Sequence, residues 1–437
     1  MTREDAGART GDTVQTATPG WRPRRYAEVA GGLSRYLGVL RYHELRFVWL
    51  AQVVSQVGDG MMTVALVWVT LNLTRSPTAL SAVLVAQTVP YLLGIFAGAL
   101  VDRWPRLATM IISDVLRGLI VLAVPIIDAV SGLHVWELVV MSFALAVVQQ
   151  FFDPAKAALT PSLVPRDDLV EANALLQSTR QILFIAGPAI GGAVIAAVGS
   201  LGVFYVDAIS FFGSAAVLLL LYRRERLPGG TVVRASGTAI MRDIREGFRY
   251  IGQKRVLMVT IAVGAVLNFL LSPLPLLIPL YIKQVVKDGA LQFGSLTSIV
   301  FVGFLVGALA VGRLARWLGK GLLAGLAIVG AGIASMAFAL GLPIWPTMGI
   351  GALGGACIAC ASITAQTIVQ EQSADEFRGR VYASYDSLTQ MGRPLSLVLG
   401  GFAADLLGVR LVFVLVGVLA ILAAMPVLAV RSLRETP

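Results

Sequence analysis

The chain contains two copies of one pattern, and the second copy follows the first at a constant offset of 209 residues. Without any gap, this offset pairs identical small or aromatic residues: Gly94 with Gly303, Gly98 with Gly307, Gly191 with Gly400, Gly192 with Gly401, Gly199 with Gly408, and Phe204 with Phe413. Asp59 falls on Asn268. Because both copies are mostly apolar, the repeat predicts a polytopic membrane protein built from two parallel halves.

The composition excludes an ordinary soluble domain. Of the 437 residues, 57% are hydrophobic and 14% are charged, whereas soluble domains carry about 25% charged residues. Runs of roughly 20 mostly apolar residues are long enough to cross a bilayer as helices. We predict an all-α integral membrane protein with twelve such spans: 47–72, 78–101, 107–129, 135–152, 170–198, 203–222, 256–282, 292–318, 321–341, 344–370, 381–405 and 409–430.

The spans fall into two six-helix bundles, at 47–222 and 256–430. The remaining segments are a polar N-terminal tail with a basic interfacial part, a linker with an amphipathic helix and a short C-terminal tail: 1–46, 223–255 and 431–437. Lysine and arginine gather in these segments and in the loops on their side, whereas the opposite loops hold Arg75, Lys283, Lys287 and Arg410. The positive-inside rule therefore predicts that both termini are cytoplasmic. It also explains the net charge of +10 without nucleic acid. We expect the protein in the plasma membrane of a bacterial cell.

Asp59 is the first candidate for proton coupling. It lies 13 residues past Arg46, about 20 Å along a helix, at a depth where a charge costs about 3 kcal/mol or more. An apolar setting would let this carboxylate take up and release protons near neutrality. The alternative is a buried carboxylate that accepts hydrogen bonds from the backbone near Gly58 and Gly60.

Other charged residues lie within the predicted spans. Asp114 and Arg117 share a helix face at i and i+3, and form either a structural ion pair or a second proton site. Asp386, seven residues before Arg393 on the same face, is a further proton-coupling candidate. We expect Asp207 and Asp405 to be solvated, because both lie near the predicted outer ends of their spans.

Polar side chains within the spans are candidates to face a substrate cavity: Gln56, Gln149, Gln150, Asn268 and Gln366. Arg180 and Arg393 join this set, either to contact an anionic substrate or to neutralise a nearby aspartate. The seventh span also carries three prolines, Pro273, Pro275 and Pro279, which must break or kink it. Broken helices in transporters line cavities or move, so we predict a gating element there; a static kink is the alternative.

The loop after the second span carries a motif of glycines and charges: Gly94, Gly98, Asp102, Arg103 and Arg106. It resembles the signature loop of the major facilitator superfamily, although Pro105 stands in place of the family's second glycine. The resemblance implies a cytoplasmic gate that latches the outward-facing state; alternatively, the loop only anchors the end of the span. The second copy has Arg313 but lacks the aspartate, so any latch is asymmetric.

The fifth span resembles the G-P-x-x-G-G motif of proton-driven exporters in that superfamily, through Gly187, Pro188, Gly191 and Gly192. The stretches 152–158, 169–175 and 378–381 are similar to the exporter branch with macrolide efflux proteins and the enterobactin exporter, and more distantly to the lysophospholipid flippase. The family implies a cavity walled by spans 1, 4, 7 and 10. The arginine that many drug–proton antiporters carry in span 4 is absent; Arg117 could serve instead.

Other motif matches carry no function here. Gly349, Gly351 and Gly354 match a dinucleotide-binding spacing but lie inside a predicted span without a preceding strand. Cys357 and Cys360 are the only cysteines and sit in apolar sequence, so we expect neither metal nor redox chemistry. The chain lacks a Walker A sequence and has only two histidines. We therefore predict no cofactor and no enzymatic activity.

These features predict an alternating-access exporter of amphipathic or cationic small molecules, driven by proton entry. We expect its partners to be substrate, protons and membrane lipid, and the protein to work as a monomer. One alternative is a siderophore or lysophospholipid exporter, which Arg180 and Arg393 would favour if they face the cavity. Another is a non-transporting membrane sensor or scaffold.

Overall fold

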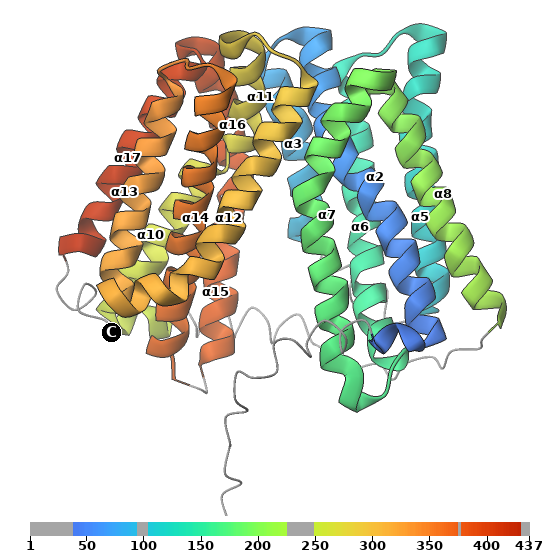
Figure 1. Cartoon of the computed structure of the whole chain (residues 1–437), viewed down its shortest axis with the longest axis horizontal. Coiled ribbons are helices and arrows are strands. Elements are labelled where there is room, and N and C mark those ends of the chain that lie inside the picture. The colour runs from blue at the N-terminus through green and yellow to red at the C-terminus, as the bar shows by residue number, and fades with distance from the viewer. Residues whose placement is uncertain (1–37, 94–103, 225–248, 375–376, 430–437) are drawn as a thin grey trace, which may run out of the picture.

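A computed structural model describes residues 38–93, 104–224, 249–374 and 377–429, and its regular elements in these ranges are helical (Figure 1). The first half contains η2 (Val39–Arg41), α2 (His43–Thr74), α3 (Pro77–Thr88), η3 (Val89–Leu93), α5 (Arg106–Ser131), α6 (Val135–Leu159), η4 (Thr160–Ser162), η5 (Arg166–Asp168), α7 (Leu169–Val198) and α8 (Ser200–Arg224). The second half contains α10 (Arg255–Leu271), α11 (Leu274–Tyr281), a π-helical turn η6 (Ile282–Val286), α12 (Ala290–Leu318), α13 (Lys320–Phe338), α14 (Ile344–Gln372), α15 (Arg378–Met391), α16 (Arg393–Leu407) and α17 (Val409–Ala429).

Within the described residues, ten helical segments are long and apolar enough to cross a membrane. Two predicted spans are not among them. The span expected at 78–101 begins as α3 and η3 and then continues beyond the described residues. The span expected at 381–405 is divided at Gly392 into α15 and α16, each too short to cross alone. Most of the tail and linker segments also lie outside the described ranges.

The proline-rich span is broken as predicted. Ser272 and Pro273 separate α10 from α11, and Pro275 and Pro279 lie within α11. Proline lacks the backbone N–H that a continuous helix needs and clashes with the preceding turn. By contrast, α7 runs without interruption through Pro188.

The internal repeat is visible in the backbone. Gly199 and Gly408 follow α7 and α16, and both have φ = +79°. Gly132 and Gly341, also 209 positions apart, have φ values of +76° and +65°. Side chains other than hydrogen rarely adopt this conformation, so glycine is favoured where these helices end.

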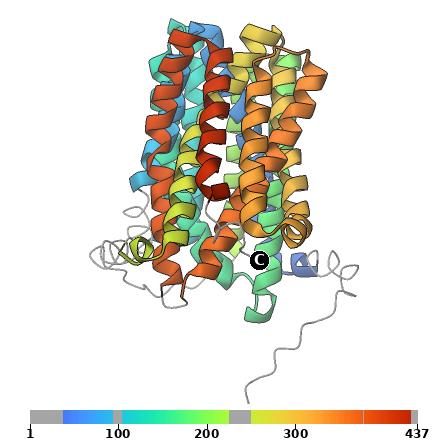
Figure 2. The same cartoon turned by 90° about the vertical axis from the view of Figure 1, so that its left-hand side faces the viewer.

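The helices pack as a first bundle (α2 to α8) and a second bundle (α10 to α17). We call the side that holds residues 75–76, 199 and 408 the closed side, and the side that holds residues 104–105, 254 and 319 the open side. The first described helix starts on the open side and α17 runs toward it (Figures 1 and 2). The described chain thus begins and ends on the same side of the molecule.

On the closed side, one apolar core joins the two bundles. Trp68 of α2 stacks on Phe293 of α12, with ring centroids 6.4 Å apart. Lys283 Nζ donates a 2.6 Å hydrogen bond to Asn72 Oδ1, and Thr78 N donates a 3.0 Å hydrogen bond to Asp405 Oδ2. Asp405 is exposed, as predicted, although it also bridges the bundles.

Repeat-related glycines lie in the contact between the bundles. An added Cβ at Gly192 of α7 would lie 2.6 Å from the carbonyl oxygen of Ala290 in α12. An added Cβ at Gly401 of α16 would lie 2.6 Å from Ser81 Oγ in α3. Since real Cβ atoms do not approach so closely, glycine permits both helix contacts.

On the open side, the apolar cores belong to separate bundles. The first bundle has a core around Leu45, Met110 and Leu218. The second bundle has two smaller cores, one around Ala327 and Ala424 and one around Leu257 and Ile261. Each of these cores is built from one bundle. Among the described residues, apolar contact between the bundles extends from the closed side to about the middle of α7 and α12, where the ring centroids of Phe184 and Phe301 lie 4.4 Å apart.

Candidate functional site

The first bundle buries an ion pair between Asp114 and Arg117, neighbours on α5. Ser214 Oγ of α8 donates a 2.6 Å hydrogen bond to Asp114 Oδ2. Arg117 Nη1 donates a 2.7 Å hydrogen bond to Gln149 Oε1 of α6. Asp114 is fully buried and Arg117 is 3% exposed. The pair therefore joins three helices through charges that have been removed from water.

Two aromatic rings cover the same arginine. The Arg117 guanidinium carbon lies 4.4 Å from the ring centroid of Phe152 and 4.5 Å from that of Phe211. Such cation–π contacts stabilise a desolvated cation by about 2 kcal/mol. Arg117 Nε finds no hydrogen-bond partner among the described residues. Gln149, a predicted cavity residue, is occupied in this network, and no pattern in the sequence had singled out Ser214, Phe152 or Phe211 as its members.

The prediction that Asp207 is solvated is wrong. Asp207 of α8 is 1% exposed, because α2 covers it at Gly58. A Cβ on Gly58 would lie 2.2 Å from Asp207 Oδ1 and 2.3 Å from Ser210 Oγ. Ser210 Oγ donates a 2.8 Å hydrogen bond to the Asp207 carbonyl oxygen and also lies 3.3 Å from Asp207 Oδ1. The carboxyl group makes no ion pair with a described side chain.

Asp59 follows Gly58 on α2 but is exposed. Gln52, Gln56 and Thr63 share its helix face at three- and four-residue spacing. Gln56 Nε2 donates a 3.2 Å hydrogen bond to Gln52 Oε1, while Gln52 Nε2 and Gln56 Oε1 have no partner among the described residues. This polar face of α2 therefore combines an accessible carboxylate with unsatisfied amide groups.

Charges from several helices surround Asp59. It interacts electrostatically with the buried Asp114–Arg117 pair, with Asp153 of α6 and with Arg180 of α7. Tyr91 of η3 interacts with Asp59, Asp153 and Arg180, and also with Arg393 of the second bundle. Tyr91, Arg180 and Arg393 are exposed. These groups therefore belong to one electrostatic neighbourhood that includes both bundles. Tyr91 and Asp153 were missed as site residues because helix spacing alone does not bring them into it.

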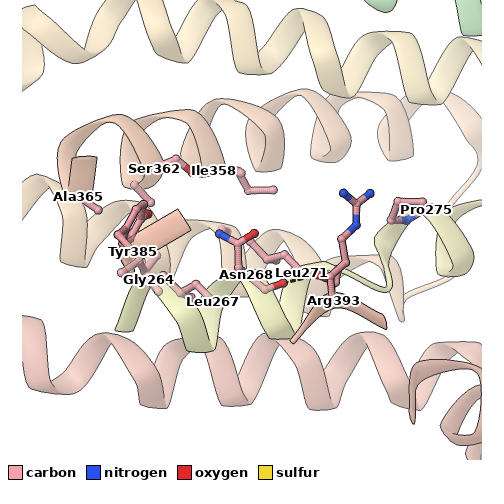
Figure 3. Close-up of a pocket in the computed structure, with 14 residues that line it drawn as sticks. Gly264, Leu267, Asn268, Leu271, Pro275, Ile358, Ser362, Ala365, Tyr385 and Arg393 are labelled. Carbon is pink, nitrogen blue, oxygen red and sulfur yellow. Dashed lines mark hydrogen bonds between the residues drawn. The ribbon is translucent and has the colours of Figure 1, made fainter. Parts of the chain in front are cut away.

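The second bundle contains a cavity of about 210 Å³ (Figure 3). Apolar and small side chains from α10, α13 and α14 make up most of its lining. Asn268 and Arg393, both predicted cavity residues, project into it, and Ser362 and Tyr385 add hydroxyl groups. Both helix breaks border the cavity, through Ser272 and Pro275 at one and Arg393 at the other.

The other predicted residues lie in different places. Gln150 Nε2 contacts the Ala146 carbonyl oxygen at 3.4 Å within α6, and Gln366 is half-buried on α14 outside the cavity lining. The Asp386 side chain lies outside the described residues. So do the gate residues Gly94, Gly98, Asp102 and Arg103. The remaining gate residue, Arg106, donates a 2.6 Å hydrogen bond from Nη1 to the Ala158 carbonyl oxygen.

The glycines of the fifth span bring α7 against α2. An added Cβ at Gly187 would lie 2.6 Å from Gly60 Cα, and one at Gly191 would lie 2.8 Å from Met61 Cα. Pro188 is buried beside Gly187. These contacts hold α7 close to the part of α2 that carries Asp59.

The chain matches a family model for transmembrane secretion effectors of the major facilitator superfamily over residues 35–436. It belongs to this family. The multidrug efflux pump Tap of Mycolicibacterium fortuitum is 28% identical over 401 residues, which cover 90% of this chain and 96% of Tap. Macrolide efflux protein A of Streptococcus pyogenes is 27% identical over 399 residues, which cover 89% of this chain and 96% of that protein.

Solved structures share the major facilitator fold with this chain. A bacterial homologue of the iron transporter ferroportin, in an inward-facing state, has a TM-score of 0.71 at 17% identity and covers 88% of this chain and 98% of its own. The nucleoside transporter NupG has a TM-score of 0.69 at 14% identity, with coverages of 89% and 99%. The transmembrane secretion effector family therefore places these helices in a multi-pass membrane transporter, as the sequence motifs implied.

Proposed function

We propose that the chain is a proton-driven exporter of amphipathic or cationic drugs, with twelve spans and cytoplasmic termini in a bacterial plasma membrane. The observation that carries the proposal is the exposed Asp59 carboxylate beside a buried charge network, in the space between two bundles joined on one side. The similarity to drug and macrolide pumps supports drug export over siderophore or lysophospholipid export.

The difference between the two sides supports alternating access. If the open side faces the cytoplasm, substrate enters there between the two bundles, whose apolar cores are separate. The core that joins the bundles on the closed side blocks its exit to the outside. The opposite state requires the contacts at Gly192 and Gly401 to part and the open-side faces to meet. A monomer contains all of these elements.

The position of Asp59 supports proton coupling. A carboxylate that is accessible from one side, and electrostatically linked to Arg117 and Arg180, can exchange its proton with water or with a cationic substrate. In our proposal, a proton from outside binds Asp59 in the outward-facing state and releases the cation to the outside. The change back to the cytoplasm-facing state carries this proton inward, where the next cation displaces it. Asp114 is the second candidate, and Asp386 remains a proposal from the sequence.

The test is extrusion of a lipophilic cationic dye and a macrolide from cells, with and without a protonophore. We expect the wild type to extrude both and the protonophore to stop it. Asp59→Asn should abolish extrusion while reaching the membrane at wild-type level. Asp167→Asn, an exposed carboxylate of η5, is the matched control and should retain activity.

Three results would count against the proposal. Extrusion that survives the protonophore would exclude proton drive. An active Asp59→Asn variant would remove Asp59 from the mechanism. A wild type that moves neither compound would contradict drug export.

A further inference from the structure

The cavity of the second bundle contains a cation, Arg393, that no described carboxylate balances. Among the described residues, Arg393 makes no ion pair or hydrogen bond, and its guanidinium projects into the cavity (Figure 3). The described side chains that line the cavity include no carboxylate. Arg180, by contrast, has Asp59 as an electrostatic partner in the first bundle. Arg393 and Arg180 therefore differ in whether a described carboxylate interacts with them.

The position of Arg393 on its helix adds to this imbalance. It is the first residue of α16, directly after the break at Gly392. The start of a helix carries a partial positive charge, so a cation there is unfavourable and an anion is favourable. An arginine at this position gains nothing from its own helix, and an anionic ligand would compensate both charges.

The other residues that line the cavity indicate the chemistry of the rest of such a ligand. Leu267, Leu271 and Ile358 offer apolar surface, while the Asn268 amide offers a donor and an acceptor. Ser272 Oγ is already used, because it donates a 2.6 Å hydrogen bond to the Asn268 carbonyl oxygen. A mostly apolar pocket with one charge and few polar groups suits an amphipathic molecule with a single anionic end.

Asp59 of the first bundle and Arg393 of the second bundle both interact electrostatically with Tyr91. Asp153 is already paired with Lys156, whose Nζ lies 3.4 Å from Asp153 Oδ1, so Asp59 is the carboxylate of this group that makes no ion pair with a described residue. We propose that Arg393 binds the carboxylate, or another anionic group, of an amphipathic substrate whose basic group faces Asp59. This inference rests on the proposed export function and narrows its substrates to molecules with both an acidic and a basic group.

The test compares ligands that differ in one charge. Ciprofloxacin carries a carboxylate and a basic amine, and its methyl ester keeps the amine alone. Binding of each to the purified full-length protein is measured by ligand fluorescence polarisation. We expect the wild type to bind the acid more tightly than the ester. Arg393→Gln should weaken binding of the acid about tenfold or more and leave the ester within about twofold.

Two variants separate this role from general structural damage. Arg393→Lys keeps the charge but loses the planar fork that pairs with a carboxylate, so it should retain part of the preference for the acid. Arg180→Gln, the matched intramembrane arginine, should cause no loss that is specific to the acid. A wild type without preference for the acid, or an Arg393→Gln variant that weakens both ligands equally, overturns the inference.

The binding result is independent of the export assay. Selective binding of the acid through Arg393, in a protein that exports no drug, would support the anion site and reject the proposed function. Cation export by a wild type that does not prefer the acid would support the proposed function and reject the anion site.

Discussion

The two bundles repeat one backbone design but bury different chemistry. The glycines that end helices or join helices recur in both, including Gly192 with Gly401 and Gly199 with Gly408. The charges do not recur: at the 209-residue offset, Asp114 becomes Leu323, Arg117 becomes Leu326, Asp153 becomes Ser362, Asp207 becomes Val416 and Asp59 becomes Asn268. Packing is thus shared between the halves, whereas charge is concentrated in the first.

The repeat therefore constrains the packing of the helices more tightly than it constrains the charged residues of the site. Leu323 and Val416 are buried, as are Asp114 and Asp207. The same buried positions therefore accept either an apolar residue or a carboxylate with local partners. The carboxylates of the first bundle are tolerated because Arg117, Ser214 and Ser210 surround them.

The largest effect on export is expected when the carboxylate of Asp59 is moved to the equivalent position of the second bundle, Asn268. In the double variant Asp59→Asn with Asn268→Asp, we expect proton-driven export to stay at background, because position 268 lacks the neighbouring Arg117 network. Dye extrusion with membrane-level controls measures this. Recovery of export would mean that a carboxylate in either bundle can carry the proton. The difference in charge between the bundles would then have no role in proton coupling.

The next effect concerns stability of the buried ion pair. Asp114→Leu should lower the free energy of unfolding by about 3–5 kcal/mol, because Arg117 is left buried without a counter-charge. Adding Arg117→Leu, which copies Leu323 and Leu326 of the second bundle, should recover most of the loss. Thermal unfolding in detergent, analysed as a double-mutant cycle, gives the result. A double variant as unstable as the single one would contradict this reasoning.

A smaller effect is expected at the α2–α8 contact. Gly58→Ala places a methyl group against Asp207 and Ser210 and should cost about 1–3 kcal/mol. Gly213→Ala is the matched control, since its Cβ would meet Val54 Cγ1 at an ordinary 3.5 Å. The control should be neutral or slightly stabilising, because alanine favours helix by about 1 kcal/mol. Equal melting temperatures for the two variants would exclude crowding at Gly58.

The smallest effect is expected on the open side of the second bundle. Lys320 Nζ lies 2.7 Å from Glu371 Oε1, and both side chains are partly exposed. Such pairs contribute about 0.2–1 kcal/mol and weaken with salt. Glu371→Gln should therefore shift unfolding only slightly, and less at high ionic strength. A loss of stability as large as that expected for Asp114→Leu would contradict the view that the Lys320–Glu371 pair is a weak surface ion pair.

The sequence predicted those features that depend on spacing along one helix. The repeat, the break at Ser272 and Pro273 and the glycine contacts of α7 could be read from residue type and position. The burial of Asp207 could not be predicted from the sequence. Its position near the start of α8 suggested contact with water, whereas Gly58 of another helix, α2, covers it. Tyr91 and Asp153 escaped notice for the same reason: their surroundings depend on how separate helices rotate and pack.

The buried charge network also bears on how the chain is made. Among the described residues, the groups that bond to Asp114 and Arg117 come from α5, α6 and α8, within the first 224 residues. The costly burial of charge can therefore be completed during synthesis, before the second half has left the ribosome. The later half then packs against the first bundle through apolar surface and glycine contacts, together with the polar contacts of Lys283 and Asp405.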